Sequence, residues 1–176
     1  MIHFDGIIFS WQKGGGVHRY FVELISGLKN ANIDATVYLQ KPNLGFPLAE
    51  NENLNIQRIG ITADRLPAPI LGLVRKITSP INKILMGRAL DRVSTGVFHS
   101  TYFTTYKNLK IPQVVTVHDM TYESFPEYFG SAGARRHITD KKRCIDNADA
   151  IICVSESTKK ALIAKYPREN PARSRA

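Results

Sequence analysis

Short apolar segments alternate with helical patterns along almost the whole chain. Segments rich in β-branched and aromatic residues lie at 2–9, 35–39, 54–59, 96–99, 113–117 and 148–154, and we expect each to form a strand. Apolar residues at helical spacing predict a helix at 17–28. We also expect helices at 66–92, with an interruption at Ser79–Pro80, at the basic segment 131–147, and at 155–166, where Ser155 or Ser157 is a candidate cap. This alternation predicts an α/β fold, in which helices cover both faces of a parallel sheet.

The length and composition limit the chain to few classes. Its 176 residues suit one domain, which we place at 1–166, followed by a polar tail at 167–176. Two cysteines are too few for a disulfide framework and suit a reducing compartment. A run of about 18–20 apolar residues, which would indicate a membrane span, is absent from the sequence, and the first residues lack the basic start of a signal peptide. We therefore predict a cytoplasmic protein.

Polar residues follow the ends of the predicted strands. They are a glycine loop (Gly14, Gly15, Gly16), then His99 to Tyr102, then His118 with Asp119, and Ser155 with Glu156. Ligands of parallel sheets bind outside the carboxyl ends of the strands, so we expect these residues along one edge.

The glycine loop was compared with known phosphate-binding loops. A dinucleotide-binding loop needs a third glycine, where this chain has Arg19, and the second strand leads into Gln40 and Lys41 instead of an acidic residue. The Gly-Lys-Ser/Thr ending of a P-loop is also missing. These departures disfavour a dehydrogenase or a P-loop NTPase. A flexible turn without a ligand stays an alternative.

Four motifs, in order, resemble those of a known enzyme family. They are Gly-Gly-Gly-Val-His-Arg-Tyr at 14–20, Phe-His-Ser-Thr-Tyr at 98–102, Val-Thr-Val-His-Asp-Met at 115–120, and Ala-Asp-Ala-Ile-Ile-Cys-Val-Ser-Glu-Ser-Thr at 148–158. Together they resemble the N-terminal domain of retaining glycosyltransferases of the GT-B fold (family 4, group 1 type), which include many bacterial mannosyl- and glucosyltransferases.

The resemblance implies a Rossmann-like domain that binds a glycan or lipid-linked acceptor in polysaccharide biosynthesis. In that family a second domain holds the nucleotide-sugar donor with a basic residue and two glutamates separated by seven residues. This sequence has no such glutamate pair. We therefore expect the N-terminal half, inactive without the donor-binding domain. The alternative is a non-catalytic binding or scaffold subunit of a split glycosyltransferase.

The resemblance also implies roles for single residues. His118 would lie beside the donor sugar and act by positioning and electrostatics, since retaining enzymes are thought to use the donor's own phosphate oxygen as base. Asp119 would orient His118 or cap the following loop. A structural histidine is the alternative for His118.

The remaining candidates are substrate contacts. Gly14, Gly15 and Gly16 would offer backbone N–H groups to donor phosphates or acceptor, and Arg19 would pair with a phosphate or carboxylate. His99 and Tyr102 are candidate acceptor contacts, and Ser155 and Glu156 would line the cleft. The alternatives are a surface role for Arg19, no ligand contact for His99 and Tyr102, and a helix cap for Ser155.

The net charge of +9 is concentrated in two segments, 65–92 and 130–176, with +5 and +6. Such segments suit an anionic partner or a solvated basic surface. Region 66–92 places its bases among six aliphatic residues, a pattern of helices that lie on membranes or pack on a sheet: Leu71, Val74, Ile77, Ile81, Ile84 and Leu85. We expect peripheral membrane contact there, no nucleic-acid module, and no metal site, since the histidines lack ligand spacing.

Overall fold

The computed structural model describes the chain except residues 41–45, 49–51, 61–67, 107, 168–173 and 176, and except the side chains of 68–77, 174 and 175. The chain divides into two compact units. Unit 1 comprises Met1–Thr101 and Tyr106–Ile111, and unit 2 comprises Tyr102–Thr105 and Pro112–Ala176. Every strand pairing within each unit that the structure describes is parallel, which confirms the predicted α/β fold class.

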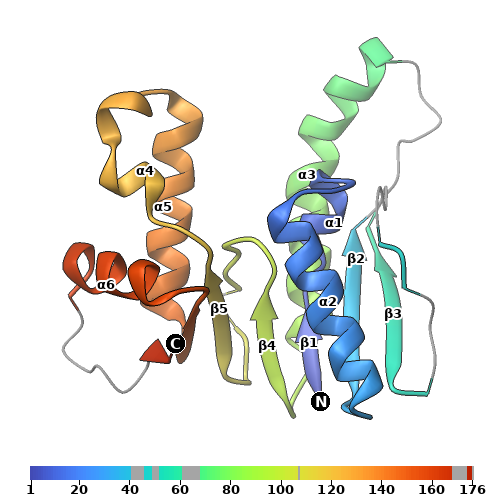
Figure 1. The fold of residues 1–176 in the computed structure, drawn as a ribbon. Helices are drawn as coiled ribbons and strands as arrows, with labels where there is room; N and C mark the ends of the chain where they lie inside the picture. Colours follow the sequence, from blue (N-terminus) through green and yellow to red (C-terminus); the bar gives the residue numbers. More distant parts are fainter. Residues whose placement is uncertain (41–45, 49–51, 61–67, 107, 168–173, 176) are drawn as a thin grey trace. The chain divides into compact units, whose positions relative to one another are not determined.

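Unit 1 contains four parallel strands in the order β3-β2-β1-β4 (Figure 1). Its elements are β1 (Ile2–Phe4), α1 (Ile7–Trp11), α2 (Gly16–Asn30), β2 (Ala35–Gln40), β3 (Leu54–Ile59), α3 (Ala68–Leu90) and β4 (Val97–Ser100). Phe4 of β1 lies level with Val37 of β2 and His99 of β4. The carboxyl ends of β1 and β4 therefore lie next to each other, and the predicted polar segment His99 to Tyr102 begins there, whereas the glycine loop follows α1.

Helices cover both faces of the sheet in unit 1. Consecutive residues of a strand point to opposite faces. The ring of His99 lies 5.3 Å from that of Phe21 in α2, whereas its neighbour Phe98 belongs to a buried cluster with Met86 and Leu90 of α3. Thus α2, drawn in front of the strands in Figure 1, covers one face and α3 covers the other.

Unit 2 contains three parallel strands in the order β5-β6-β7. Its elements are β5 (Gln113–Val117), α4 (Thr121–Ser124), a 3-10 turn (Pro126–Tyr128), α5 (Ala132–Asn147), β6 (Ala150–Cys153), α6 (Glu156–Lys165) and β7 (Ser174–Arg175). Its core joins Val115 and Val117 of β5 to Ile145 of α5 and Leu162 of α6. The core fixes the end of β5 against both helices.

The expectation of one strand over 2–9 is wrong in its second half, because β1 ends at Phe4 and α1 follows. Gly6 has the left-handed φ of +56°, and a Cβ there would lie 2.8 Å from the carbonyl oxygen of Tyr38. Only glycine adopts this turn without strain and fits so close to β2. The Asp5 carboxylate accepts from the Ile7 N–H at 3.4 Å as the chain turns into α1.

The interruption expected at Ser79–Pro80 is also wrong, because α3 continues through Pro80. Proline inside a helix removes one backbone hydrogen bond and costs roughly 3 kcal/mol. Met86 and Leu90 of the same helix are fully buried, and their packing offsets this cost. No helix among the described residues is long and apolar enough to cross a membrane.

The predicted boundary between a domain at 1–166 and a tail stays a prediction. Within the predicted tail, the described residues Ser174 and Arg175 pair in parallel with Ile151 and Ile152 of β6.

Candidate functional site

The predicted site residues fall in both units. Gly14, Gly15, Gly16, Arg19 and His99 belong to unit 1, and Tyr102, His118, Asp119, Ser155 and Glu156 belong to unit 2. Each group has its own geometry within its unit. That the two groups share one edge stays a prediction.

In unit 1 the glycine loop is exposed and leads into α2. Gly15 caps this helix with a φ of +122°, and its carbonyl accepts from the Arg19 N–H at 2.9 Å. A Cβ at Gly14 or Gly16 would meet no described atom within 4 Å. The Arg19 side chain is 84% exposed, with the Glu23 carboxylate 4.0 Å away. The loop thus presents backbone to solvent at the positive end of a 15-residue helix.

His99 has a different environment, since it is only 5% exposed. Its ring lies 5.5 Å from Phe4 and 5.3 Å from Phe21. This is the environment of a histidine in the core. Its contact with an acceptor stays a prediction.

A buried hydrogen-bond network joins the carboxyl ends of β1 and β4. One Asp5 carboxylate oxygen accepts from the Thr101 hydroxyl at 2.5 Å and from the Thr101 N–H at 3.0 Å. The Thr101 hydroxyl oxygen accepts from the Ile8 N–H at 3.3 Å. Asp5 and Thr101 are 0% and 2% exposed, so the network holds α1 against β4 without contact with water.

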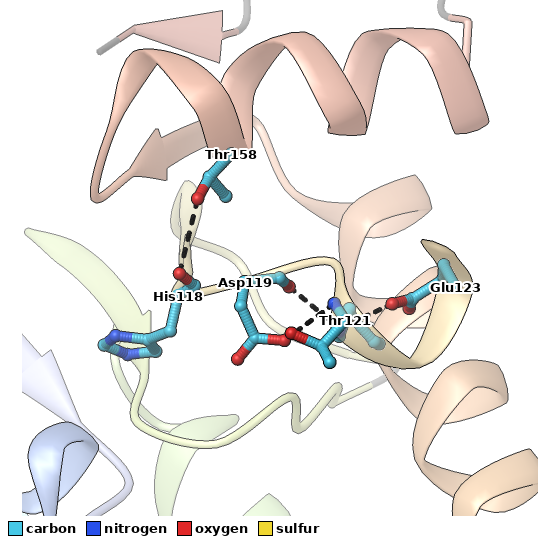
Figure 2. A network of polar contacts seen from close by, with 6 residues as sticks. His118, Asp119, Thr121, Glu123 and Thr158 are labelled. Carbon is cyan, nitrogen blue, oxygen red and sulfur yellow. Dashed lines mark hydrogen bonds and ion pairs between the residues drawn. The ribbon is translucent and has the colours of Figure 1, made fainter. Parts of the chain in front are cut away.

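In unit 2, His118 and Asp119 directly follow β5 (Figure 2). The Thr158 hydroxyl donates to the His118 carbonyl at 3.4 Å. The Asp119 carboxylate accepts from the N–H of Thr121, the first residue of α4, at 2.9 Å. This bond suits the predicted capping of the loop after Asp119, and the orientation of His118 by Asp119 stays a prediction.

The surroundings of His118 and Asp119 determine the charge of these two side chains. Burial lowers the pKa of His118; Asp119 opposes this effect and the Lys141 charge adds to it. Burial alone would raise the pKa of Asp119, but hydrogen bonds from Thr121 and the charges of Lys141 and His137 leave it below its usual value. Near neutral pH the site therefore holds a neutral imidazole beside an ionised carboxylate.

Ser155 is connected to His118 by hydrogen bonds through one residue, Thr158. Its side-chain oxygen caps α6 by accepting from the Thr158 N–H at 3.1 Å, as the cap interpretation predicted. Thr158 in turn bonds to the His118 carbonyl (Figure 2). Glu156 is exposed in the first turn of α6, 3.9 Å from Lys159. The structure thus links the ends of β5 and β6.

Tyr102 belongs to a half-buried group of rings. The centroids of Tyr102 and Tyr122 lie 5.8 and 4.7 Å from that of His137, and Phe129 lies 4.4 Å from Tyr122. Burial raises the pKa of Tyr102, and the neighbouring Tyr122 and Asp119 add to this effect. The phenol is therefore a neutral hydrogen-bonding group close to the Asp119 carboxylate.

The comparison with protein families agrees with the motifs. The model of the family described as Glycosyltransferase Family 4 matches residues 14–173. The chain belongs to glycosyltransferase family 4. The match covers the segments that contain the glycine loop, His118 with Asp119, and Ser155. A search of curated proteins gave no match.

Sequence reasoning missed three residues of this family 4 domain that lie around His118 and Asp119. They are Glu123 of α4 and His137 and Lys141 of α5. The helical period gave a usable signal for Lys141, because the buried residues of α5 are Ala134, Lys141, Cys144 and Ile145, at helical spacings of seven, three and four. Glu123 lies in a four-residue helix with no periodicity to indicate burial.

The site of this family 4 domain offers hydrogen bonds and charge. Among the described residues, no group of three or more His, Cys, Asp or Glu side chains could hold a metal ion. A neutral imidazole, a carboxylate and a phenol provide donors and acceptors of the kind that bind sugar hydroxyl groups.

Proposed function

We propose that this family 4 domain binds a glycan or lipid-linked acceptor at the carboxyl end of β5, and that a donor-binding domain supplies the nucleotide sugar. The main support is the half-buried, neutral His118 directly after β5, beside the ionised Asp119 and tied through Thr158 to the Ser155 cap. A glycosyltransferase needs such fixed polar groups, because sugars are held by directional hydrogen bonds to their hydroxyl groups.

The chemistry that the resemblance implies is transfer with retention. The acceptor hydroxyl oxygen forms a bond to the anomeric carbon, the bond from that carbon to the donor phosphate breaks, and the phosphate oxygen takes the hydroxyl proton. His118 then holds a sugar hydroxyl, and the negative charge of Asp119 favours the positive charge that develops on the sugar ring. In this proposal Gly14, Gly15, Gly16 and Arg19 contact phosphate.

Peripheral membrane contact of region 66–92 at the cytoplasmic face belongs to the same proposal. Ile81 and Ile84 of α3 are 37% and 56% exposed, which suits contact with lipid. The side chains of Leu71, Val74 and Ile77 lie outside the described residues.

Transfer assays test the proposal. We expect no transfer of sugar from any nucleotide sugar by the purified chain alone, and transfer when it is joined to a donor-binding domain of family 4. In the joined protein, His118→Ala should lower the rate sharply while the unfolding midpoint stays close to wild type. Turnover by the chain alone would contradict the need for a donor domain, and an unchanged rate in His118→Ala would remove His118 from the site. Stable association without any transfer would favour the scaffold alternative.

A further inference from the structure

We propose that Lys141 is a positioning residue that fixes the backbone of the His118–Asp119 segment from the core of unit 2. The inference deepens the proposed function and rests on it, because the segment that Lys141 holds is the proposed acceptor site. Lys141 itself does not touch substrate in this proposal, since its side chain is only 1% exposed.

The buried ammonium group of Lys141 has a partner for each of its N–H donors. Its Nζ donates to the Asp119 carbonyl at 3.0 Å and to the Glu123 carboxylate at 2.9 Å. The same atom lies 5.5 Å from the centroid of the Phe103 ring. An ammonium group has three N–H donors, so two hydrogen bonds and one ring face use all three directions.

These contacts join segments that are far apart in sequence. Phe103 lies before β5, Asp119 lies directly after β5, and Glu123 lies in α4. Lys141, in the middle of α5, holds all three. Because it bonds to the carbonyl of Asp119 and not to its carboxylate, the carboxylate stays available to cap Thr121 and to face solvent.

A stabilising role alone is a poor explanation for this pair. The Glu123 side chain is also only 1% exposed, and two buried charges lose their hydration. Apolar residues of similar volume often replace such pairs without loss of stability. They would not donate to the Asp119 carbonyl. The pair is therefore better explained by the geometry and charge that it gives to the loop.

The charge of Lys141 also acts in the direction that the site requires. It lowers the pKa of both His118 and Asp119, which favours a neutral imidazole and an ionised carboxylate. It lowers the pKa of His137 as well, whereas Glu123, Asp119 and Asp140 raise it. One buried cation thus biases three titrating groups around the loop.

The test compares three variants of the full chain. Lys141→Met removes the charge and the donors at similar length. The double variant Lys141→Met/Glu123→Leu removes both charges, which restores stability if the single variant is unstable. Lys142→Met is the matched control on the same helix, because it breaks the exposed ion pair with Asp146 and the contact of its Nζ with the Tyr166 ring but leaves every contact of Lys141 in place.

Hydrogen exchange and histidine titration by NMR give the decisive readouts. We expect the amides of Thr121 and Ser124 to exchange about ten- to a hundredfold faster in both Lys141 variants, since a bond from a charged donor to the loop is lost. The pKa of His118 should rise in both, and the control should match wild type. The double variant should recover the unfolding midpoint without recovering slow exchange.

Two results would overturn the inference: exchange and His118 titration unchanged in the Lys141 variants, or both returned to wild type in the double variant. Transfer by the joined protein gives a separate readout, where we expect the double variant to lose activity despite its stability. If the wild-type joined protein transfers no sugar, the proposed function fails, while exchange and titration still decide whether Lys141 positions the loop.

Discussion

Replacing Thr101 with valine removes one hydroxyl group from the buried network between β1 and β4. Valine has nearly the same shape, so the change tests hydrogen bonding with little change in packing. The lost bond to the Asp5 carboxylate is 2.5 Å long, and the Ile8 N–H loses its acceptor at 3.3 Å. Asp5 keeps its bond from the Thr101 N–H at 3.0 Å.

The expected loss follows from these bonds. A hydrogen bond to a charged group contributes about 1.5–3 kcal/mol, and a buried N–H left without an acceptor costs about 1 kcal/mol when its original bond was long. The free energy of unfolding of unit 1 should therefore fall by about 2.5–4 kcal/mol. For a chain of this size that corresponds to a shift of about 5–16 °C in the unfolding midpoint.

Urea unfolding combined with amide exchange in β1 and β2 measures the loss where it occurs, in unit 1. Thr101→Ser is the matched control, because it keeps the hydroxyl and should lose much less stability than Thr101→Val. The reasoning is refuted if Thr101→Val lies within about 0.5 kcal/mol of wild type, or if the serine variant loses as much as the valine variant.

Three further predictions concern a turn, a helix cap and acid stability. Gly6→Ala should lower the free energy of unfolding by about 2 kcal/mol or more, because φ is +56° and the Tyr38 oxygen is 2.8 Å from the new Cβ. Gly27→Ala, at an open position in the last turn of α2, should raise it by about 0.5–1 kcal/mol in the same urea titration; equal effects of the two changes would contradict the assigned turn. Ser155→Ala should lower the free energy of unfolding by about 1 kcal/mol, because α6 loses its cap. Urea denaturation of Ser157→Ala should show almost no change, and the reverse result would assign the cap to Ser157. Burial lowers the pKa of His118, so as the pH falls the unfolded chain binds a proton at this histidine before the folded chain does. The stability from neutral His118 is therefore fully present above pH 6.5 and is lost as the pH falls through the lower native pKa. Urea midpoints across that range should show a smaller loss in His118→Gln than in wild type, and an identical loss would exclude this histidine as a cause.

Elements marked by local signals could be predicted from sequence. The strand at 113–117 has the predicted bounds because it is a short apolar run closed by two polar residues. The helix at 155–166 was predicted with Ser155 or Ser157 as its cap, and the Ser155 hydroxyl makes the capping bond. In both cases the signal and the structure lie within a few residues of each other.

The turn at Gly6 could not be predicted in the same way. The run 2–9 is apolar except for His3, Asp5 and Gly6, so a strand and a buried helix have the same composition there. What decides between them is the close approach of Gly6 to Tyr38 and the bonds of Asp5 to Thr101, which are contacts with other strands. Such contacts leave no local pattern.

The site residues likewise divide into those with a local sequence signal and those that depend on distant contacts. His118 and Asp119 were found because they end a predicted strand, where ligands of parallel sheets bind. Lys141 was missed because a lysine in a basic helix is usually solvated. Its burial depends on a carboxylate 18 residues earlier in the chain and on the backbone of Asp119, 22 residues earlier. Helical spacing places Lys141 on the buried face of α5, but it does not reveal these two partners.

The most direct test of the central claim is to map acceptor binding on the chain itself. Short oligosaccharides ending in mannose or glucose, titrated into the isotope-labelled protein, should shift NMR signals of His118, Asp119, Tyr102 and Ser155 first and most. Lys142→Met should bind like wild type, and His118→Ala should bind more weakly. Shifts confined to residues away from the end of β5, or equal binding by His118→Ala, would contradict the assignment of this edge as the acceptor site.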